Sequence, residues 1–301
     1  MASTLRERLS AGDFVLTAEI SPPLSADPKD LIERAAPLKG LADAVNVTDG
    51  AGARAHMDST VAAHLIRRQG IEPILQLTCR DRNRIALQSQ LVGAAALGLV
   101  NLLALTGDDP KAGDQPDAKP VFDLDSAGLI ATAAAIRDRH MLPTGRAVGG
   151  EPDFFLGVAD SPLDPPDGWK PTGLRKKIDA GAQFAQTQFC MDTAVLRRYL
   201  EALSREGLLS KLHVLVGVAP LASAKSARWI VSHLKGSLIP DWIVERLERA
   251  ADPKAEGEAI CVDLVGEMRE IPGVAGAHVM APLNDAAIAR VLERLRRTLS
   301  D

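Results

Sequence analysis

The chain has 301 residues, of which 46% are hydrophobic and 25% charged, and its formal net charge is −4. These are ordinary values for a globular protein, and the absence of a basic stripe or a block of like charges argues against a nucleic-acid surface or an interaction tail. The N-terminal stretch is polar, and no run reaches the roughly 18 uninterrupted apolar residues of a membrane span. We therefore expect neither a secretory signal nor insertion into a membrane.

The three cysteines, Cys79, Cys190 and Cys261, lie far apart in the sequence. An odd number without Cys-x-x-Cys or Cys/His spacing argues against a disulfide framework and against a zinc or iron–sulfur site. The six histidines show no ligand spacing either. The sequence therefore predicts a cytoplasmic protein without a metal ion.

Short β-rich runs alternate with helical patterns from one end of the chain to the other. The runs predict strands at residues 14–20, 44–48, 72–79, 101–106, 154–160, 184–189, 213–220 and 276–282. A polar excursion, residues 107–120, follows the fourth of them. Helical patterns occupy residues 28–38, 57–70, 83–98, a segment from about 125, 173–182, 193–207, 222–268 with breaks at 237–242 and 251–257, and 285–299.

Eight strands, each followed by a helix, predict an α/β protein folded as a (β/α)8 TIM barrel, with a single domain over residues 1–301. An open doubly wound sheet is the alternative. No G-x-G-x-x-G motif follows the first strand, and the eight units are evenly spread without a linker. Both observations favour the barrel.

The carboxyl ends of the strands are where such a barrel gathers its chemistry. These ends carry Glu19, Thr48, Asp49, Gln76, Thr78, Thr106, Gly107, Asp108, Asp160, Gln188, Met280 and Pro282. We expect their side chains to share one pocket.

Glu19 lies within LTAEISPP, where the strand pattern continues on both sides. A partly buried carboxyl group holds its proton more readily than one in water, and a general acid needs this property. The alternative is a structural glutamate paired with an arginine from a neighbouring strand. Strand position alone does not decide between the two.

Asp108 follows Gly107 at the end of the fourth strand and should lie at the pocket rim. A glycine lets the backbone approach a ligand closely, and a carboxylate can accept hydrogen bonds from the ring N–H and amino group of a heterocycle. Asp109, ahead of a proline, is better explained as a helix cap. Gln188 could bind a planar ligand or could be a core amide satisfied by its neighbours.

Basic and polar clusters flank two of the predicted helices. Arg175 to Lys177 could be a solvated helix face, or could meet phosphates because their helix follows a long loop. The segment CRDRN, residues 79–83, is expected to cap the helix that follows it. Cys79 has no evident base beside it, which argues against a nucleophilic role.

Six motifs, in this order, resemble the methylenetetrahydrofolate reductase family: AEISPP, NVTDGAGAR, QLTCRDRN, LALTGDDP, LRKKIDAGAQFAQTQFCMD and VGVAPLAS. The resemblance runs along nearly the whole chain, and LRKKIDAGAQFAQTQF and ALTGD are its most specific parts. The motifs CRDRN and LTGD are most similar to those in the reductase half of bacterial bifunctional homocysteine methyltransferase–reductases. We expect no methyltransferase half within residues 1–301.

The resemblance implies non-covalent FAD, NADH or NADPH as co-substrate, and the reduction of 5,10-methylenetetrahydrofolate to 5-methyltetrahydrofolate or the reverse oxidation. By position, it makes Glu19 the general acid that helps to open the imidazolidine ring. It makes Asp108 a contact of the pterin that also modulates the flavin, and Gln188 a contact of the folate or the nicotinamide. Flavin contacts fall on Thr48, Gly107, Ala159, Lys176 and Lys177.

Four positions near the implied flavin depart from the family pattern. Gln76 stands where the classical bacterial reductase has histidine, Thr106 replaces an arginine, Asp49 replaces a tyrosine, and Phe122 stands near a family tyrosine. We include these four among the cofactor-binding positions. They leave the flavin binding mode and the electron donor open, and some relatives take electrons through a partner subunit. A homo-oligomer is also left open.

Two other classes of protein remain as alternatives. One is a flavin-free, pterin-binding barrel that transfers a one-carbon unit, and the other is a non-catalytic subunit of an electron-transfer complex. A flavin absorbance band would exclude the first. The intact set of Glu19, Asp108 and Gln188 argues against the second.

Overall fold

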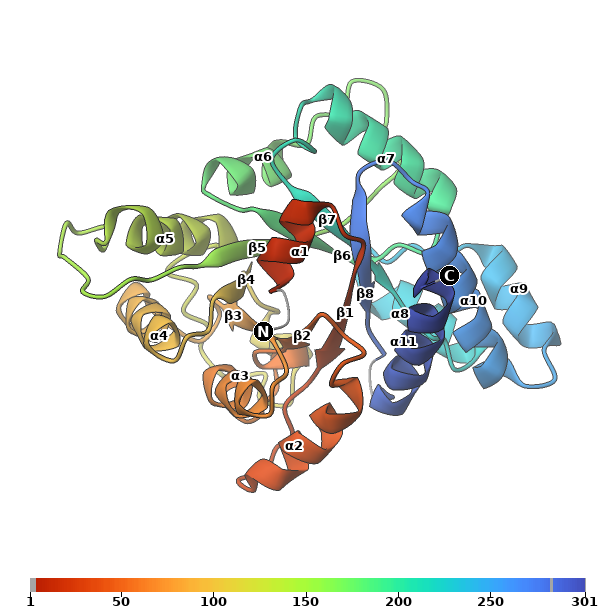
Figure 1. Cartoon of the computed structure of the whole chain (residues 1–301), viewed down its shortest axis with the longest axis horizontal. Helices are drawn as coiled ribbons and strands as arrows, with labels where there is room; N and C mark the ends of the chain where they lie inside the picture. The colour runs from red at the N-terminus through yellow and green to blue at the C-terminus, as the bar shows by residue number, and fades with distance from the viewer. Residues whose placement is uncertain (1–3, 282–283, 301) are drawn as a thin grey trace.

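The structure, a computed structural model, describes residues 4–281 and 284–300. Eight parallel strands close into one barrel in chain order, which confirms the predicted TIM barrel and excludes the open sheet (Figure 1). The strands are β1 (Val15–Ile20), β2 (Ala44–Val47), β3 (Pro73–Thr78), β4 (Asn101–Leu105), β5 (Phe155–Asp160), β6 (Phe184–Phe189), β7 (His213–Val218) and β8 (Val274–Val279).

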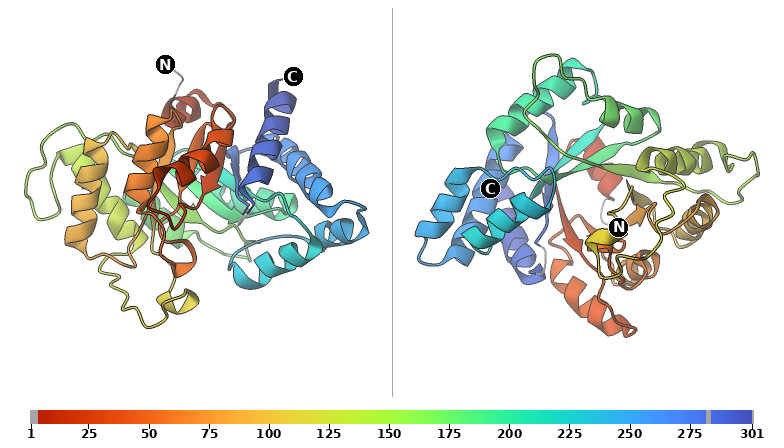
Figure 2. Two further views of the ribbon diagram at one scale, coloured as in Figure 1. Left: turned by 90° about the horizontal axis from the view of Figure 1, so that it is seen from below. Right: turned by 180° about the vertical axis from the view of Figure 1, so that it is seen from behind.

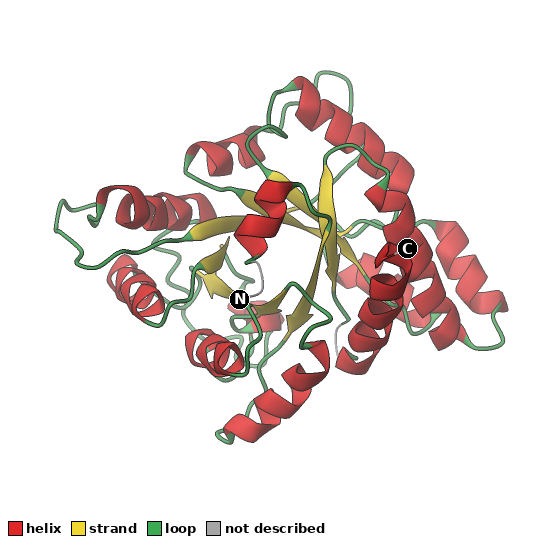
Figure 3. Cartoon of the chain, viewed as in Figure 1, coloured by secondary structure: helices red, strands yellow, loops and turns green. Residues whose placement is uncertain are grey.

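Helices surround the barrel and cover its outer face, as the secondary-structure colouring in Figure 3 shows. They bury an apolar layer between themselves and the outward-facing strand residues. These helices are α2 (Pro28–Ala35), α3 (Ser59–Arg68), α4 (Arg84–Ala96), α5 (Ser126–Arg139), α6 (Thr172–Asp179), α7 (Thr193–Arg205), α8 (Ala224–His233), α9 (Asp241–Arg249), α10 (Pro253–Arg269) and α11 (Asp285–Ser300). None of the helices in the described ranges is long and apolar enough to cross a membrane.

The boundaries follow local chemistry that the sequence displays. Asn83 accepts hydrogen bonds from the first backbone N–H groups of α4, so the expected cap is confirmed. The predicted break at residues 251–257 is wrong over most of its length, because α10 begins inside it. Asp252 caps this helix, and Pro253 occupies its first position, where a missing N–H costs nothing.

The N-terminal helix α1 (Leu5–Ala11) lies across the amino-terminal end of the barrel, in the centre of Figure 1. Its Leu5 and Leu9 are buried against the inward-facing residues at the start of the strands. The backbone N–H of Leu5 also donates to Glu72 Oε1 at 3.0 Å. This helix therefore closes the floor of the barrel. The loop between β4 and α5 extends from the opposite end (Figure 2, left).

Above this apolar floor the barrel interior becomes polar. Side chains alternate along a strand, so Thr17, Asn46, Gln186 and His278 point inward from β1, β2, β6 and β8, and all four are buried. Asn46 and Gln186 exchange two hydrogen bonds, of 2.6 and 3.0 Å. A polar layer of this kind sits directly beneath the residues at the carboxyl ends of the strands.

Candidate active site

The open end of the barrel is the end opposite α1, because all eight strands run parallel and finish there. Glu19 on β1, Gln76 on β3 and Gln188 on β6 lie at this end, and Asp108 lies in the loop after β4. Pro282, which the sequence also places here, lies outside the described residues. These residues therefore lie at the same end of the barrel. Of the strand-end set, Thr106 and Asp160 line the cavity described below, and Glu19, Asp108 and Gln188 do not.

Glu19 is half-buried, with 26% of its side chain exposed. Its Oε2 accepts a hydrogen bond of 2.8 Å from Gln76 Nε2, and His278 Nε2 lies 3.7 Å from the same oxygen. The alternative of pairing with an arginine is not found in the described part of the chain. The carboxyl group instead accepts one hydrogen bond from an amide on β3 and lies near a histidine nitrogen on β8.

Asp108 is exposed on the loop that begins at Gly107. Gly107 has φ +97°, and a Cβ there would lie 2.9 Å from the Cβ of Arg80, so only glycine fits. The carboxylate of Asp109 accepts a 2.9 Å hydrogen bond from the N–H of Lys111, which confirms its role as a cap. Asp108 is therefore the aspartate of this pair that is left for a ligand.

Gln188 lies where the pairing of β6 and β7 shifts register. Its Oε1 accepts a 3.0 Å hydrogen bond from the N–H of Phe189, while its Nε2 has no hydrogen-bond partner within residues 4–281 and 284–300. A Cβ on Gly217 of β7 would lie 2.4 Å from the carbonyl oxygen of Thr187, so a glycine is needed beside this irregularity. The amide nitrogen of Gln188 is available to a ligand.

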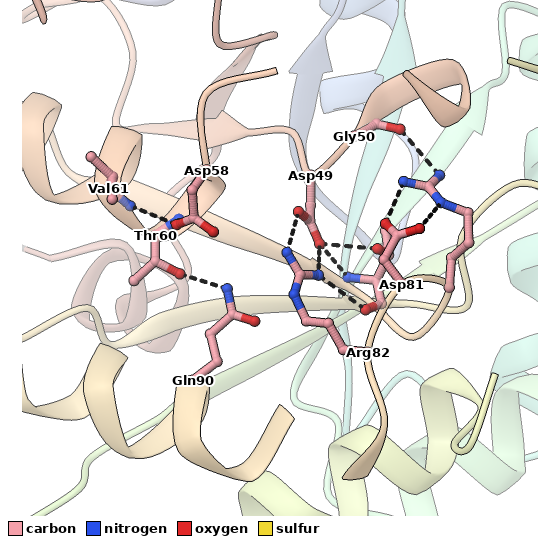
Figure 4. Close-up of polar contacts among 10 residues, drawn as sticks. Asp49, Gly50, Asp58, Thr60, Val61, Asp81, Arg82 and Gln90 are labelled. Carbon is pink, nitrogen blue, oxygen red and sulfur yellow. Dashed lines mark hydrogen bonds and ion pairs between the residues drawn. The ribbon is translucent and has the colours of Figure 1, made fainter. Parts of the chain in front are cut away.

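Asp49 ties two strand ends together (Figure 4). Arg82 donates to both of its oxygens, at 2.6 and 2.9 Å, and the N–H and hydroxyl of Thr78 donate to Oδ2 at 2.8 and 3.0 Å. Burial alone would raise the pKa of Asp49, but the hydrogen bonds and charge of Arg82 and the bonds from Thr78 outweigh it and hold the pKa below its usual value. Both oxygens of the Asp49 carboxylate thus already accept hydrogen bonds from residues of the protein.

Two further predicted positions border the mouth. Thr48 is buried, and its hydroxyl donates to Ser21 Oγ at 3.2 Å. Phe122 is 38% exposed and has φ +43°, a backbone conformation that is unusual for an aromatic residue. The N–H of the preceding Val121 donates to the carbonyl of Arg80 at 2.7 Å, which fixes the loop at this point.

A cavity of about 450 Å³ opens beside the ends of β4 and β5 and under the start of α6. Three predicted cofactor positions, Thr106, Ala159 and Lys177, line it. Lys177 Nζ donates to the carbonyl of Ala159 at 2.6 Å, and burial lowers the pKa of this lysine although the charges of nearby aspartates oppose the shift. Lys176 is exposed and pairs with Asp125 at 2.7 Å outside the cavity lining.

Residues that the sequence did not single out complete the cavity wall. The hydroxyl of Tyr199, on α7, donates to the carboxylate of Asp160, and burial together with the charge of Asp160 raises the pKa of Tyr199. The ring of Trp169 lies against that of Tyr199, with 5.5 Å between ring centroids. Tyr199 is the only tyrosine of the chain, but nothing in the sequence indicated that α7 would bring it to the end of β5.

His278 was also missed as a partner of Glu19. The alternation along β8 was a usable signal, because it places His278 inside the barrel, two residues before Met280. The described residues contain no group of three or more His, Cys, Asp or Glu side chains that could hold a metal ion.

A sequence model of the methylenetetrahydrofolate reductase family matches residues 4–296, almost the whole chain. The chain belongs to this family. Its members are oxidoreductases, which confirms the enzyme class expected from the sequence.

Curated relatives show the same similarity at low identity. The 5,10-methylenetetrahydrofolate reductase of Pectobacterium carotovorum subsp. carotovorum is 25% identical over 266 residues, which cover 84% of this chain and 81% of that protein. The enzyme of the same name from Escherichia coli K12 is 23% identical with the same coverage. Methylenetetrahydrofolate reductase (NADH) 1 of Arabidopsis thaliana is 24% identical over 85% of this chain and 43% of that protein.

Solved structures with this fold have more distant sequences. A protein from Clostridium thermocellum that binds two copies of 5-methyl-5,6,7,8-tetrahydrofolic acid superposes with a TM-score of 0.70 at 14% identity, covering 98% of this chain and 99% of that one. The EDTA monooxygenase of Chelativorans sp. BNC1 gives 0.60 at 14% identity, covering 95% and 93%. Both share the barrel architecture.

Proposed function

We propose that this enzyme interconverts 5,10-methylenetetrahydrofolate and 5-methyltetrahydrofolate with the help of bound FAD. The observation that carries the proposal is the mouth of the barrel, where the carboxyl group of Glu19 is held by Gln76 while Asp108 and the amide of Gln188 are left for a ligand. Membership of the methylenetetrahydrofolate reductase family supports the same reaction.

Glu19 is proposed as the general acid. Opening the five-membered ring of the substrate requires a proton on an amine nitrogen, and a half-buried carboxyl group at the mouth can supply it. Gln76 holds one oxygen of this group in place, so the acid has a fixed direction. In the reverse reaction the same carboxylate would take the proton back.

Asp108 and Gln188 are proposed to bind the folate. A pterin ring presents a ring N–H beside an amino group, and an exposed carboxylate can accept hydrogen bonds from both. The free Nε2 of Gln188 can donate a hydrogen bond to an oxygen or nitrogen of the same planar ligand. The Clostridium thermocellum protein, which shares the fold, supports this part of the proposal, since it binds 5-methyl-5,6,7,8-tetrahydrofolic acid.

The residues around the cavity fit a flavin. Thr106 and Lys177 offer polar groups to the cavity, and the small side chain of Ala159 leaves room in it. We therefore propose that the cavity side of the mouth holds FAD, with Thr48, Asp49, Gln76, Phe122 and Lys176 in the surrounding shell. FAD, when bound, supplies hydride transfer, and the barrel supplies its orientation.

NADH or NADPH is the proposed electron donor, and one relative, the Arabidopsis protein, carries NADH in its name. A partner subunit that delivers electrons, and assembly of copies of this chain, stay open in the proposal. The three cysteines are free and buried, which supports the cytoplasm as its compartment.

Anaerobic half-reactions test the proposal. The purified protein should show a flavin absorbance band, NADH should bleach it, and methylenetetrahydrofolate added next should restore it. A colourless protein that moves a one-carbon unit would instead support the flavin-free barrel. A yellow protein that NADH and NADPH cannot bleach, but that a partner subunit reduces, would change the proposed donor.

A further inference from the structure

His278 lies beneath Glu19 in the polar layer of the barrel. It is 2% exposed, and its two ring nitrogens face different groups. Nε2 lies 3.7 Å from Glu19 Oε2, while Nδ1 lies 2.9 Å from Thr17 Oγ1 and 3.4 Å from Gln186 Nε2. The imidazole thus links the candidate acid to the buried polar residues below it.

The groups around Nδ1 determine which ring nitrogen carries the hydrogen. Gln186 Nε2 is an amide NH2 group, which can only donate, and it donates to Asn46 Oδ1 at 3.0 Å and to Thr17 Oγ1 at 3.3 Å, with Nδ1 at 3.4 Å. The hydroxyl of Thr17 lies closer to Nδ1, at 2.9 Å, than to the carbonyl of Ala277, at 3.4 Å, so donation to Nδ1 is its better bond. Both neighbours therefore favour an unprotonated Nδ1, and the hydrogen of the neutral ring is on Nε2.

The opposite tautomer would be unfavourable at both nitrogens. A hydrogen on Nδ1 would take the 2.9 Å contact with Thr17, whose hydroxyl would then have only the 3.4 Å bond to the carbonyl of Ala277, and the lone pair on Nε2 would face the carboxyl oxygen of Glu19. Among the described residues, Glu19 is the charged side chain in contact with His278, and Thr17 and Gln186 are uncharged. The tautomer therefore depends on a small, defined set of neighbours.

We propose that His278, held in its Nε2–H tautomer by Thr17 and Gln186, is a positioning residue for Glu19. Together with Gln76 it turns two N–H groups toward Oε2, which makes this oxygen an acceptor. The acid proton of Glu19 is then carried by Oε1. After the proton has left, the same two N–H groups stabilise the carboxylate. This assignment rests on the proposed role of Glu19 as the general acid.

The tautomer can be measured without any turnover. In protein labelled with ¹⁵N-histidine, a two-bond ¹⁵N–¹H correlation spectrum distinguishes the two tautomers, and the His278→Gln variant identifies the signals of His278. We expect the spectrum to show the Nε2–H form. Glu19→Gln should shift the Nε2 signal, and Thr17→Val should give a mixture of tautomers.

Kinetics then test the effect on the acid. His278→Leu removes the N–H that lies 3.7 Å from Oε2 and should slow the folate half-reaction by up to about 10-fold, less than the loss of a full hydrogen bond to a charged group would. Thr17→Val should slow it less, and Thr17→Ser, which keeps the hydroxyl, should restore it. The reduction of the flavin by NADH should stay unchanged in all three variants.

The outcomes separate the two proposals. A wild-type protein without folate turnover contradicts the proposed function, while the spectra still report whether His278 and Glu19 are coupled. An Nδ1–H tautomer, or a His278 signal that Glu19→Gln leaves in place, overturns the positioning role. So does a folate half-reaction of normal rate and pH profile in a folded His278→Leu protein. If His278→Leu does not fold, Thr17→Val provides both readouts.

Discussion

At the scale of single residues, Gln76, one of the positions expected to depart from the family pattern, acquires a structural meaning. The amide Nε2 of Gln76 donates to Glu19, so this residue holds the proposed acid from β3, which is separated from β1 by β2. An uncharged amide can hold the carboxyl group without competing for its proton. The substitution therefore preserves the acid and changes the surroundings of the proposed flavin.

Replacing Glu19 by glutamine tests the acid directly. Glu19→Gln keeps the size and one carbonyl oxygen but has no proton to give, so folate turnover should fall by about 10²- to 10⁴-fold, the usual contribution of general acid catalysis. Flavin reduction by NADH should remain near the wild-type rate in stopped-flow absorbance measurements. Glu270→Gln, an exposed residue at the end of α10, is the matched control. An equal loss of both half-reactions would argue against the role of Glu19.

Residue positions at the mouth could be predicted from the sequence, but their partners could not. Glu19, Asp108 and Gln188 follow from the rule that strand ends carry the chemistry. The contact between Glu19 and Gln76 depends on the register across β1, β2 and β3, and that with His278 on the closure of the barrel between β8 and β1. Neither the strand register nor the closure of the barrel can be predicted from a local pattern of residues.

At the scale of the elements, the ion pair of Asp49 with Arg82 connects the end of β2 to the segment that leads from β3 to α4 (Figure 4). The Asp49 side chain is 6% exposed and that of Arg82 19%. Loss of one partner leaves the other charge buried without compensation. The rim of the mouth on this side therefore depends on a single carboxylate.

Asp49→Asn should lower the free energy of unfolding by about 3–5 kcal/mol at neutral pH, the range for one partner removed from a buried pair. The folded-state pKa of Asp49 lies below its usual value, so its contribution is complete above the unfolded pKa of about 3.9 and is lost as the pH falls through the folded-state pKa. The difference between variant and wild type, measured by urea unfolding, should shrink below about pH 4.

The control for this variant is Asp164→Asn, which breaks the exposed ion pair with Arg198 and should cost far less. A constant difference between Asp49→Asn and wild type down to the lowest pH at which both fold would contradict the electrostatic explanation.

Boundaries of elements were predictable where one residue type controls them. β6 has the predicted limits, and the other strands differ by up to two residues at their ends, except β8, which ends at Val279. Pro253 was the misleading residue, because a proline ends a helix from its interior but begins one at the first position. Only the cap formed by Asp252 distinguishes the two.

At the scale of the whole molecule, the barrel has one closed and one open end. The sequence predicted the closed ring of strands, but the N-terminal segment was recognised only as polar. Leu5 and Leu9 of α1 cover the floor of the barrel because the starts of the eight strands bring apolar residues together there. Such a set exists only after the barrel has closed, so no local pattern displays it.

Leu9→Ala tests how much the floor contributes. Leu9 is 2% exposed, and removing a buried leucine side chain should lower the free energy of unfolding by about 2–5 kcal/mol. Leu24→Ala is the matched control, since Leu24 is 79% exposed and should change stability little. Equal effects of the two substitutions in urea unfolding would show that α1 does not pack as described.

Binding of the cofactor should stabilise the entire fold. A ligand at about 100 times its dissociation constant adds about 2.7 kcal/mol to the free energy of unfolding, so FAD should raise the Tm of flavin-depleted protein in a thermal scan. Lys177→Met, in the cavity wall, should reduce this rise, while Lys225→Met, at the start of α8, should not. An unchanged Tm at saturating FAD would contradict a flavin site.

The packing of Trp169 on Tyr199 gives the protein an optical property of its own. Of the three tryptophans, Trp169 alone lines the cavity, whereas Trp229 and Trp242 are about half exposed on α8 and α9. Its fluorescence should therefore be quenched most strongly when a light-absorbing ligand binds in the cavity, and that of Trp229 and Trp242 should be affected less. Trp169 is therefore an intrinsic fluorescence probe at the cavity, and a fluorimeter can follow ligand binding and release there without an added dye.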